Sequence, residues 1–285
     1  MSNSIILKKK IDRFNKSIRV SGDKSLSIRW ILFSSLAEGI SKAENLLLSE
    51  DIFAAINAIK KLGIKVKFEK NKCKIYGKGL NGYNFRKNLV INAANSGTLG
   101  RLILGLLINT KYPIKLIGDK SLSKRDFKRI SDPLSQFGAK FKLNKNKYLP
   151  LKITGASNIN SIKYFEQKGS AQCKSAVIFA GMKASGTTKI KAKKSRNHTE
   201  LLCKYLNLPI SIKNKEKYDE IKIKRVKKIK PFNYVIPSDI SSSAFFIVLT
   251  ALNSQSKLLI KNVNINPSRT GVITILKKMG VEINY

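Results

Sequence analysis

Four clusters of small, hydroxyl-bearing residues each stand at the start of an apolar stretch of the sequence. The clusters begin at Ser25, Ser96, Ser170 and Ser241, so their first serines lie 71, 74 and 71 residues apart. The first three each have a cationic side chain close by. At the start of a helix, exposed N–H groups, hydroxyls and a nearby cation are the groups that bind an oxyanion. The clusters therefore predict binding sites for phosphate or carboxylate groups.

Arginine is rare in this chain, which has 10 Arg against 46 Lys. Arg29, Arg101, Arg125 and Arg196 nevertheless all lie in or beside serine-containing motifs. A planar guanidinium binds a carboxylate or phosphate through two parallel hydrogen bonds, which favours arginine over lysine at an anion site. For a single cluster such as that at Ser25, the alternative stays open that the serine only caps a helix and the cations are solvated.

The formal net charge is +39, and the lysines are dispersed along the chain with few dense blocks. The sequence shows no basic stripe with exposed aromatics and no reading helix, so we expect no nucleic-acid partner. Its apolar stretches are too short to span a bilayer, and the N-terminus does not have the order of a secretory signal. We expect a cytoplasmic protein that binds small anions and does not contact a membrane.

The remaining reactive side chains point to neither a metal nor a nucleophile. Cys73, Cys173 and Cys203 lack Cys-x-x-Cys spacing, which predicts free thiols in a reducing compartment and no metal site. The single histidine, His198, is expected to be solvated or to cap a helix, in a segment over 195–200 that reads as a capping box. Asp51 and Asp239 are also expected to cap helices.

Each cluster opens a longer unit with a fixed order of elements. An apolar helix, a strand, an amphipathic helix ended by glycine and a strand-turn-strand follow one another, most clearly over 28–76. The apolar helices are predicted at 28–36, 102–107, 176–182 and 244–252. Because they are apolar almost all round, we expect them inside the structure, between sheets. The repeat predicts an α/β fold with buried helices.

The fourth unit is incomplete in the sequence. It has both helices and a predicted strand over 281–283, but no returning strand. Segments 5–7 and 18–20 read as strands that no unit uses, and we expect them to close the fourth sheet.

These motifs, in this order, resemble the family of 5-enolpyruvylshikimate-3-phosphate synthase, or 3-phosphoshikimate 1-carboxyvinyltransferase. The matching segments are 22–29, 95–101, 118–125, 170–176, 195–200, 239–246 and 269–271. The resemblance implies a two-domain enolpyruvyl transferase fold built from βαβαββ repeats with buried helices. Residues 21–236 would form a complete three-repeat domain that binds shikimate 3-phosphate. Residues 1–20 and 237–285 would form a partial second domain.

The implied reaction transfers the enolpyruvyl group of phosphoenolpyruvate to the 5-hydroxyl of shikimate 3-phosphate and releases phosphate. It belongs to the shikimate pathway, toward chorismate and the aromatic amino acids, and needs no cofactor or metal. By motif, Lys24 would be the catalytic residue that contacts both substrates. Ser25 and Arg29 would hold the shikimate carboxylate, and Gly97 and Arg125 would hold phosphoenolpyruvate.

Four further residues would bind shikimate 3-phosphate: Ser170, Ala171 through its backbone, Gln172 and Ser195. One departure from the family pattern is Asp126, which follows Arg125 where the family has proline. A carboxylate there is expected to lower the local positive potential and the affinity for phosphoenolpyruvate.

The chain stops before the family's catalytic aspartate and its later lysine and arginine motifs. We therefore expect a chain that is catalytically incomplete alone, either a monomer or completed by a separate C-terminal fragment. Two alternatives stay open. One is the sister enolpyruvyl transferase that acts on UDP-N-acetylglucosamine, and the other is a non-catalytic fragment that binds anions.

Overall fold

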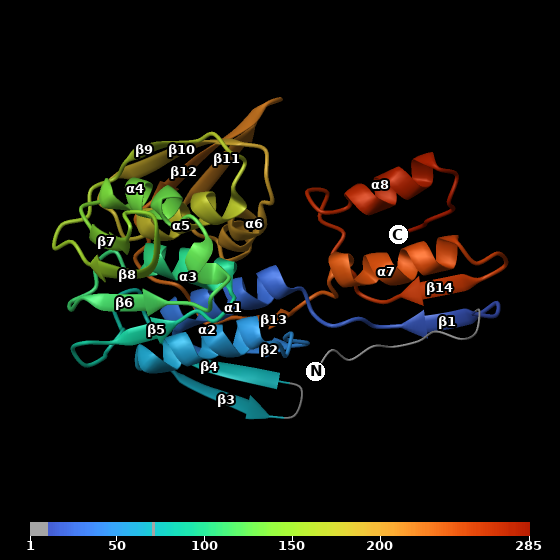
Figure 1. Cartoon of the computed structure of the whole chain (residues 1–285), viewed down its shortest axis with the longest axis horizontal. Coiled ribbons are helices and arrows are strands. Elements are labelled where there is room, and N and C mark those ends of the chain that lie inside the picture. The colour runs from blue at the N-terminus through green and yellow to red at the C-terminus, as the bar shows by residue number, and fades with distance from the viewer. Residues whose placement is uncertain (1–10, 70–71) are drawn as a thin grey trace. The chain divides into compact units, whose positions relative to one another are not determined.

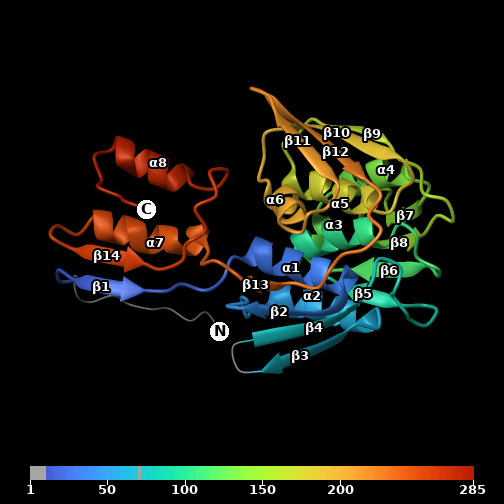
Figure 2. The same cartoon turned by 180° about the vertical axis from the view of Figure 1, so that it is seen from behind.

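The computed structural model describes residues 11–69 and 72–285 and is drawn from opposite sides in Figures 1 and 2. The chain forms two compact units. Unit 1 consists of Met1–Asp23 with Pro237–Tyr285, and unit 2 consists of Lys24–Ile236. Unit 2 is therefore continuous in sequence, whereas unit 1 is made from both ends of the chain.

Unit 2 contains three four-stranded sheets of one topology, in the strand orders β13-β2-β4-β3, β5-β6-β8-β7 and β9-β10-β12-β11. In each, the first two strands are parallel and the following pairs are antiparallel. The first sheet consists of β13 (Asn233–Val235), β2 (Glu38–Glu44), β4 (Lys72–Lys78) and β3 (Lys65–Glu69). The second consists of β5 (Val90–Asn92), β6 (Ile114–Ile117), β8 (Tyr148–Thr154) and β7 (Lys140–Asn144). The third consists of β9 (Lys163–Glu166), β10 (Thr187–Lys193), β12 (Tyr218–Lys224) and β11 (Ile210–Asn214).

The helices complete the repeat. The inner helices are α1 (Lys24–Leu36), α3 (Gly97–Leu106) and α5 (Ala171–Gly181), and the outer ones are α2 (Glu50–Lys61), α4 (Lys128–Ser135) and α6 (His198–Tyr205). The second and third units run βαβαββ along the chain, with the short 3₁₀ helix η1 (Leu122–Lys124) before α4. In the first unit, β13 from the end of unit 2 supplies the first strand. The predicted α/β fold of βαβαββ repeats is confirmed.

The inner helices form the core of unit 2, as their all-round apolar sequences predict. The rings of Phe33 in α1 and Phe179 in α5 pack against each other with centroids 4.8 Å apart and planes tilted by 46°. A Cβ on Gly105 of α3 would lie 2.2 Å from the carbonyl oxygen of Ala176, so glycine allows α3 and α5 to pack backbone against backbone. The three cysteines are free, as predicted, and all three are buried.

Within its described residues, unit 1 holds a two-stranded parallel sheet and two helices. Strand β1 (Asn15–Ile18) pairs with β14 (Lys257–Ile260), and the helices are α7 (Ile240–Ala251) and α8 (Gly271–Lys278). Asp239 caps α7, since its side chain accepts a hydrogen bond from the N–H of Ser241 at 2.9 Å. The strand expected at 18–20 is thus found slightly earlier, and the segment 5–7 lies outside the described residues.

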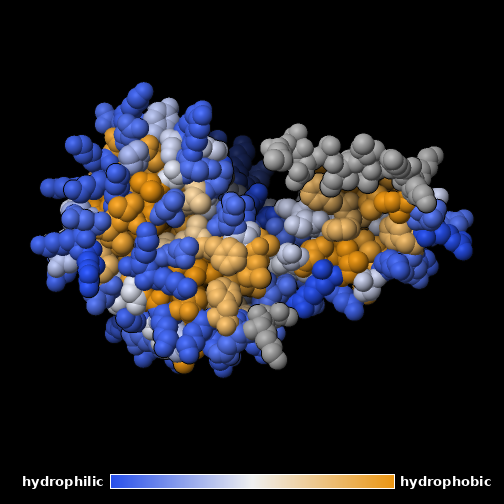
Figure 3. All heavy atoms as spheres, turned by 60° about the horizontal axis from the view of Figure 1, so that its bottom comes forward, coloured by the Kyte–Doolittle hydropathy of each residue, from blue (hydrophilic) through white to orange (hydrophobic). Residues whose placement is uncertain are grey.

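Helix α7 departs from the prediction that every apolar helix lies inside. Phe245 is 80% exposed and Leu252 82%, and only Ile240 and Ser243 of the helix are buried. The inner helices of unit 2 bury one another, whereas the described part of unit 1 contains no second helix of this kind. Figure 3 shows apolar residues exposed on this unit.

Two other features follow from the described residues. The strand predicted over 281–283 does not form, because an extended segment needs a partner with which to share backbone hydrogen bonds, and the described part of unit 1 offers none there. None of the described helices has the length and apolar character that crossing a membrane requires.

Candidate functional site

The N-terminal ends of the three inner helices lie together in unit 2. Arg29 of α1 donates through Nη2 to Oγ of Ser175 in α5 at 3.1 Å. Arg101 of α3 donates through Nη1 to Oε1 of Gln172 in α5 at 2.6 Å. All four residues lie in the first two turns of their helices. Because helix N-termini carry partial positive charge, their grouping creates a region that favours anions.

Two of the cluster serines cap these helices. Oγ of Ser96 accepts a hydrogen bond from the N–H of Leu99 at 3.3 Å, and Oγ of Ser170 accepts one from the N–H of Cys173 at 3.2 Å. The N–H of Ser170 in turn donates to the buried carboxylate of Glu166 at 2.7 Å. Capping at these two positions is compatible with a ligand, because each cap satisfies only one of the free N–H groups of its helix.

Two guanidinium groups meet at the start of α3. A Cβ on Gly97 would lie 3.0 Å from Nη1 of Arg101 and 3.0 Å from Nη1 of Arg125, so a side chain at this position would crowd both. Arg125 donates through Nη2 to Oδ1 of Asn95 at 3.0 Å. Across residues 11–69 and 72–285, neither arginine forms an ion pair with a carboxylate. Two positive charges are thus held beside a helix N-terminus with amide oxygens as acceptors.

The sequence predicts Arg101 as part of an anion-binding motif but assigns it no substrate. Its guanidinium lies over the ring of Phe127, 5.3 Å from the centroid, and donates through Nη2 to the carbonyl of Asp126 at 3.4 Å. Burial lowers the pKa of Arg101, and the positive charges of Arg125 and Arg129 act in the same direction. An anion bound here would offset this repulsion.

The side chain of Gln172 is fixed from both ends of its amide. Its oxygen accepts from Arg101, and its Nε2 donates to Oγ1 of Thr98 at 3.0 Å. The sequence predicts Gln172 as a site residue but contains no signal that two residues of α3 orient its side chain.

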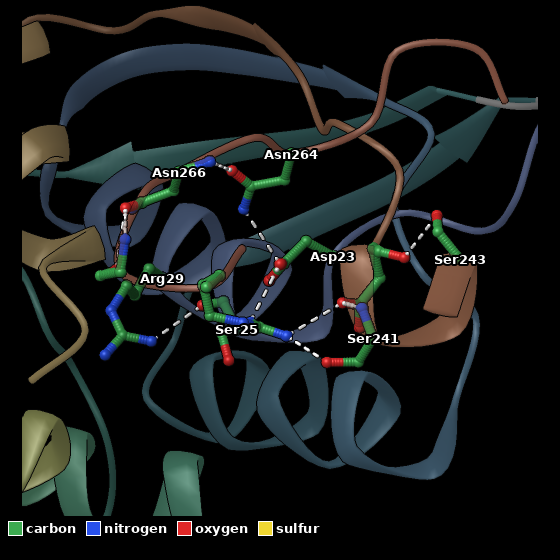
Figure 4. A network of polar contacts seen from close by, with 10 residues as sticks. Asp23, Ser25, Arg29, Ser241, Ser243, Asn264 and Asn266 are labelled. Atoms are coloured by element: carbon green, nitrogen blue, oxygen red, sulfur yellow. Dashed lines mark hydrogen bonds and ion pairs between the residues drawn. The ribbon is translucent and has the colours of Figure 1, made fainter. Parts of the chain in front are cut away.

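Arg29 is directed into the protein. It is 2% exposed, and besides its bond to Ser175 it donates through Nε to Oγ1 of Thr199 at 2.7 Å and through Nη1 to the carbonyl of Ser25 at 3.0 Å. Figure 4 shows Arg29 beside Ser25. Arg29 therefore ties the start of α1 to α5 and α6.

Lys24 is the most exposed of the predicted site residues at the start of α1. Its Nζ lies 3.3 Å from Oδ2 of Asp51 in α2. Asp51 is not the cap that the sequence predicted, because the N-cap is Ser49 and Asp51 lies within the first turn. An exposed lysine with one partner retains donors for a ligand.

The segment before α6 holds an unused hydroxyl. Oγ of Ser195 is buried and has no hydrogen-bond partner among the described residues. The expected capping box is wrong: Asn197 is the N-cap without a side-chain cap bond, and Glu200 instead pairs with Lys174 at 2.6 Å. His198, expected to be solvated or a cap, is buried at the first position of the helix.

Unit 1 has a polar network of its own, drawn in Figure 4. Arg269 contacts Asp23 through Nη1 at 3.3 Å and Asp239 through Nη2 at 3.1 Å, and it also donates to Oγ of Ser241. Asn264 donates to Asp23 at 3.1 Å. The fourth serine cluster is thereby engaged within the protein.

The described part of the chain contains no group of three or more His, Cys, Asp or Glu side chains that could hold a metal ion. The candidate site is therefore built from cations, amides, hydroxyls and helix N-termini.

Comparisons of the sequence and of the structure with known proteins point to the same family. The sequence model of the family described as EPSP synthase (3-phosphoshikimate 1-carboxyvinyltransferase) matches residues 8–285. A 3-phosphoshikimate 1-carboxyvinyltransferase of Caldicellulosiruptor bescii is 42% identical over 95% of this chain and 62% of its own length. One from Bacillus cytotoxicus is 39% identical over 93% of this chain and again 62% of its own. A solved structure of EPSP synthase from Acinetobacter baumannii matches with a TM-score of 0.86 at 35% identity, covering 94% of this chain and 60% of that one. The chain thus spans less than two thirds of the length of these relatives.

Proposed function

The chain belongs to the EPSP synthase (3-phosphoshikimate 1-carboxyvinyltransferase) family, and from this premise we propose that its unit 2 binds shikimate 3-phosphate. The reaction it would serve transfers the enolpyruvyl group of phosphoenolpyruvate to the 5-hydroxyl of shikimate 3-phosphate and releases phosphate. Both substrates are phosphorylated carboxylates, which suit a site made of guanidinium groups and helix N-termini.

The pair of arginines at Gly97 is the observation that carries this proposal. Arg101 and Arg125 bring two guanidinium groups beside one helix N-terminus, and neither is neutralised by a carboxylate within the described residues. Arg101 is partly buried, whereas Arg125 is exposed. A partly buried positive charge without a counter-ion is costly unless a ligand supplies one. Gly97 and Arg125 would receive the carboxylate or phosphate of phosphoenolpyruvate.

Shikimate 3-phosphate would bind at the start of α5. Ser170, the backbone of Ala171 and the oriented amide of Gln172 lie there, and the unpaired hydroxyl of Ser195 would supply a further hydrogen bond. Lys24 would contact both substrates, since its exposed ammonium is free to leave Asp51. Ser25 and Arg29 would position the shikimate carboxylate, Arg29 chiefly by holding α1 against α5 and α6.

Titration calorimetry of the chain with shikimate 3-phosphate tests the proposal. Binding should be measurable and should weaken about tenfold in Gln172→Ala and in Ser195→Ala, the loss expected for one or two hydrogen bonds to a charged ligand. Gln136→Ala, which changes an exposed glutamine at the end of α4, is the matched control and should bind like the parent. Equal affinity in all four proteins would refute the site assignment.

The chain would not complete the reaction alone. Unit 1 exposes the apolar helix α7, whereas its counterparts α1, α3 and α5 are covered by one another. We infer that further copies of the repeat, on this polypeptide or on a separate C-terminal fragment, cover α7 and supply the remaining catalytic groups, and that the protein is otherwise a cytoplasmic monomer.

Complementation tests this inference. The part of the Caldicellulosiruptor bescii relative that this chain does not match, added as a separate polypeptide, should protect the amides of α7 from hydrogen exchange. It should also give phosphate release from phosphoenolpyruvate and shikimate 3-phosphate. Release by the chain alone at an equal rate would contradict the inference.

A further inference from the structure

A cavity of about 1090 Å³ lies at the C-terminal ends of the inner helices of unit 2. Glu38 follows α1, Asn109 follows α3 and Lys183 follows α5, and all three line it. The inner helices have 13, 10 and 11 residues, so the cavity lies about 15 to 20 Å from the grouped N-termini. None of the residues of the candidate site lines it.

All three repeats of unit 2 build this cavity. Besides the turns that follow the inner helices, each repeat contributes the segment after its last strand. These segments are 79–82 after β4, 157–160 after β8 and 225–227 after β12. The cavity therefore marks the place where the three repeats meet, at the end of the core opposite to the candidate site.

A buried ammonium group lies in its wall. Lys183 is 9% exposed, and its Nζ donates to the carbonyl of Leu106 at 2.6 Å and to Oδ1 of Asn109 at 2.8 Å. It also lies 5.7 Å from the ring centroid of Tyr83. Leu106 is the last residue of α3, so Lys183 satisfies a free carbonyl and opposes the negative end of the helix.

The lining is strongly cationic. Lys78, Arg225 and Lys227 join Lys183. Among the described residues that line the cavity, Glu38 is the one acidic side chain, and it pairs with Lys228 at 2.8 Å. Four asparagines supply amide donors and acceptors. Arg225 is notable because arginine is rare in the chain, and its guanidinium can donate two parallel hydrogen bonds to one phosphate or carboxylate.

We propose that this cavity is a second ligand site, which binds a small multivalent anion bearing phosphate or carboxylate groups. Arg225 and Lys227 contact its charged oxygens, and the asparagines donate to its remaining oxygens. Lys183 supplies positive charge from the wall of the cavity. The site is separate from the substrate site and does not depend on the proposed function.

Burial lowers the pKa of Lys183 to about 7. An anion in the cavity favours the ammonium form, so binding should take up a proton at slightly alkaline pH. The other charged or titratable groups around Lys183 are Glu38, Lys78, Tyr83, Arg225 and Lys227. Comparing the parent with Lys183→Met isolates the contribution of this one amine.

Calorimetry with inorganic pyrophosphate and with citrate, in separate titrations near physiological ionic strength, tests the proposal. The background variant carries Lys24→Ala and Arg125→Ala, so that binding at the candidate site does not contribute. Either probe should bind, and the stronger one tells whether phosphate or carboxylate is preferred. Arg225→Gln with Lys227→Gln should weaken binding about tenfold or more, as expected for the loss of charge-assisted hydrogen bonds.

The matched control is Lys213→Gln with Lys215→Gln, which removes the same charge from exposed positions in and next to β11, outside the cavity. It should keep the parent affinity. Proton uptake, measured in buffers of different ionisation enthalpy, should disappear in Lys183→Met. If Lys183→Met does not fold, the variant Arg225→Gln with Lys227→Gln still tests the proposal, because both residues are exposed. Absence of binding by both probes, or equal weakening in the control, overturns the proposal.

Discussion

Nη1 of Arg101 lies 2.6 Å from Oε1 of Gln172, so a side chain of α3 sets the orientation of an amide that α5 presents at the candidate site. Thr98 accepts from the other end of the same amide at 3.0 Å. Two consecutive repeats thereby share one polar contact. The amide cannot rotate without breaking both bonds, so it is held ready for a ligand.

Arg101→Lys should weaken the binding of shikimate 3-phosphate by about tenfold, because a single ammonium cannot bond Gln172 and the carbonyl of Asp126 as a guanidinium does. Calorimetry gives the affinity. Arg86→Lys, at an exposed position of unit 2, is the control and should have no effect. Unchanged affinity in Arg101→Lys would show that Gln172 needs no such support.

Gly97→Ala should reduce the affinity for phosphoenolpyruvate by about tenfold while leaving stability within about 0.5 kcal/mol. The new methyl group would lie 3.0 Å from both Arg101 and Arg125 and would displace their flexible ends from the helix N-terminus. Gly271→Ala is the comparison, since nothing lies within 4 Å of a Cβ at the start of α8. Fluorescence titration and thermal unfolding of both variants separate binding from folding.

Lys174→Met should destabilise the chain by about 3 to 5 kcal/mol, because it leaves the carboxylate of Glu200 buried without a counter-charge. The two side chains are 0% and 2% exposed and 2.6 Å apart. Urea unfolding measures the change. The double variant Lys174→Met with Glu200→Leu should recover most of the loss.

The exposed ion pair of Lys72 and Glu44, 2.9 Å apart, provides the contrast. Lys72→Met should change the free energy of unfolding by less than about 1 kcal/mol. A small effect of Lys174→Met, comparable with that of Lys72→Met, would mean that the buried pair is not maintained in solution.

Stability should depend on pH through Lys183. Its folded pKa is about 7, lowered by burial, whereas an unfolded lysine titrates near about 10.4. Between these values the unfolded chain binds more protons, so the contribution of Lys183 to stability rises with pH over this range and is lost as pH falls toward 7. The unfolding free energy of the parent minus that of Lys183→Met should therefore increase from about pH 7 to about pH 10, in favour of the parent. A constant difference would show that the amine is not desolvated.

The repeat could be predicted from the sequence because helix-opening serines and helix-ending glycines recur at matched positions. The helix starts were predicted too late, at 102 in place of Gly97 and at 28 in place of Lys24. Apolar periodicity begins only where large apolar residues begin, whereas the backbone hydrogen bonds of a helix begin at its cap. Exposure of α7 could not be predicted, since the sequence of one helix does not say what covers it.

For the candidate site, too, the sequence predicts particular residues but not the contacts that they form. Motif position predicts Gln172 and Arg125 as site residues. The hydrogen bonds that Gln172 forms with Arg101 and Thr98 join residues more than 70 positions apart and have no local signature. Glu200 matches a capping pattern and instead pairs with Lys174, because helix packing buries both side chains and brings the two charges to 2.6 Å. Local motifs predict candidate site residues, and the packing of the helices decides what each of these residues contacts.

The pairing of β1 with β14 joins Asn15 to Lys257, across the whole of unit 2. During synthesis, the N-terminal strand must wait without its partner until the whole of unit 2 and β14 have left the ribosome. Unit 2 is continuous and can fold in the meantime, as domains generally do during translation. Unit 1 is therefore the late and slow step of folding, because closing a loop of this length precedes any gain from its sheet.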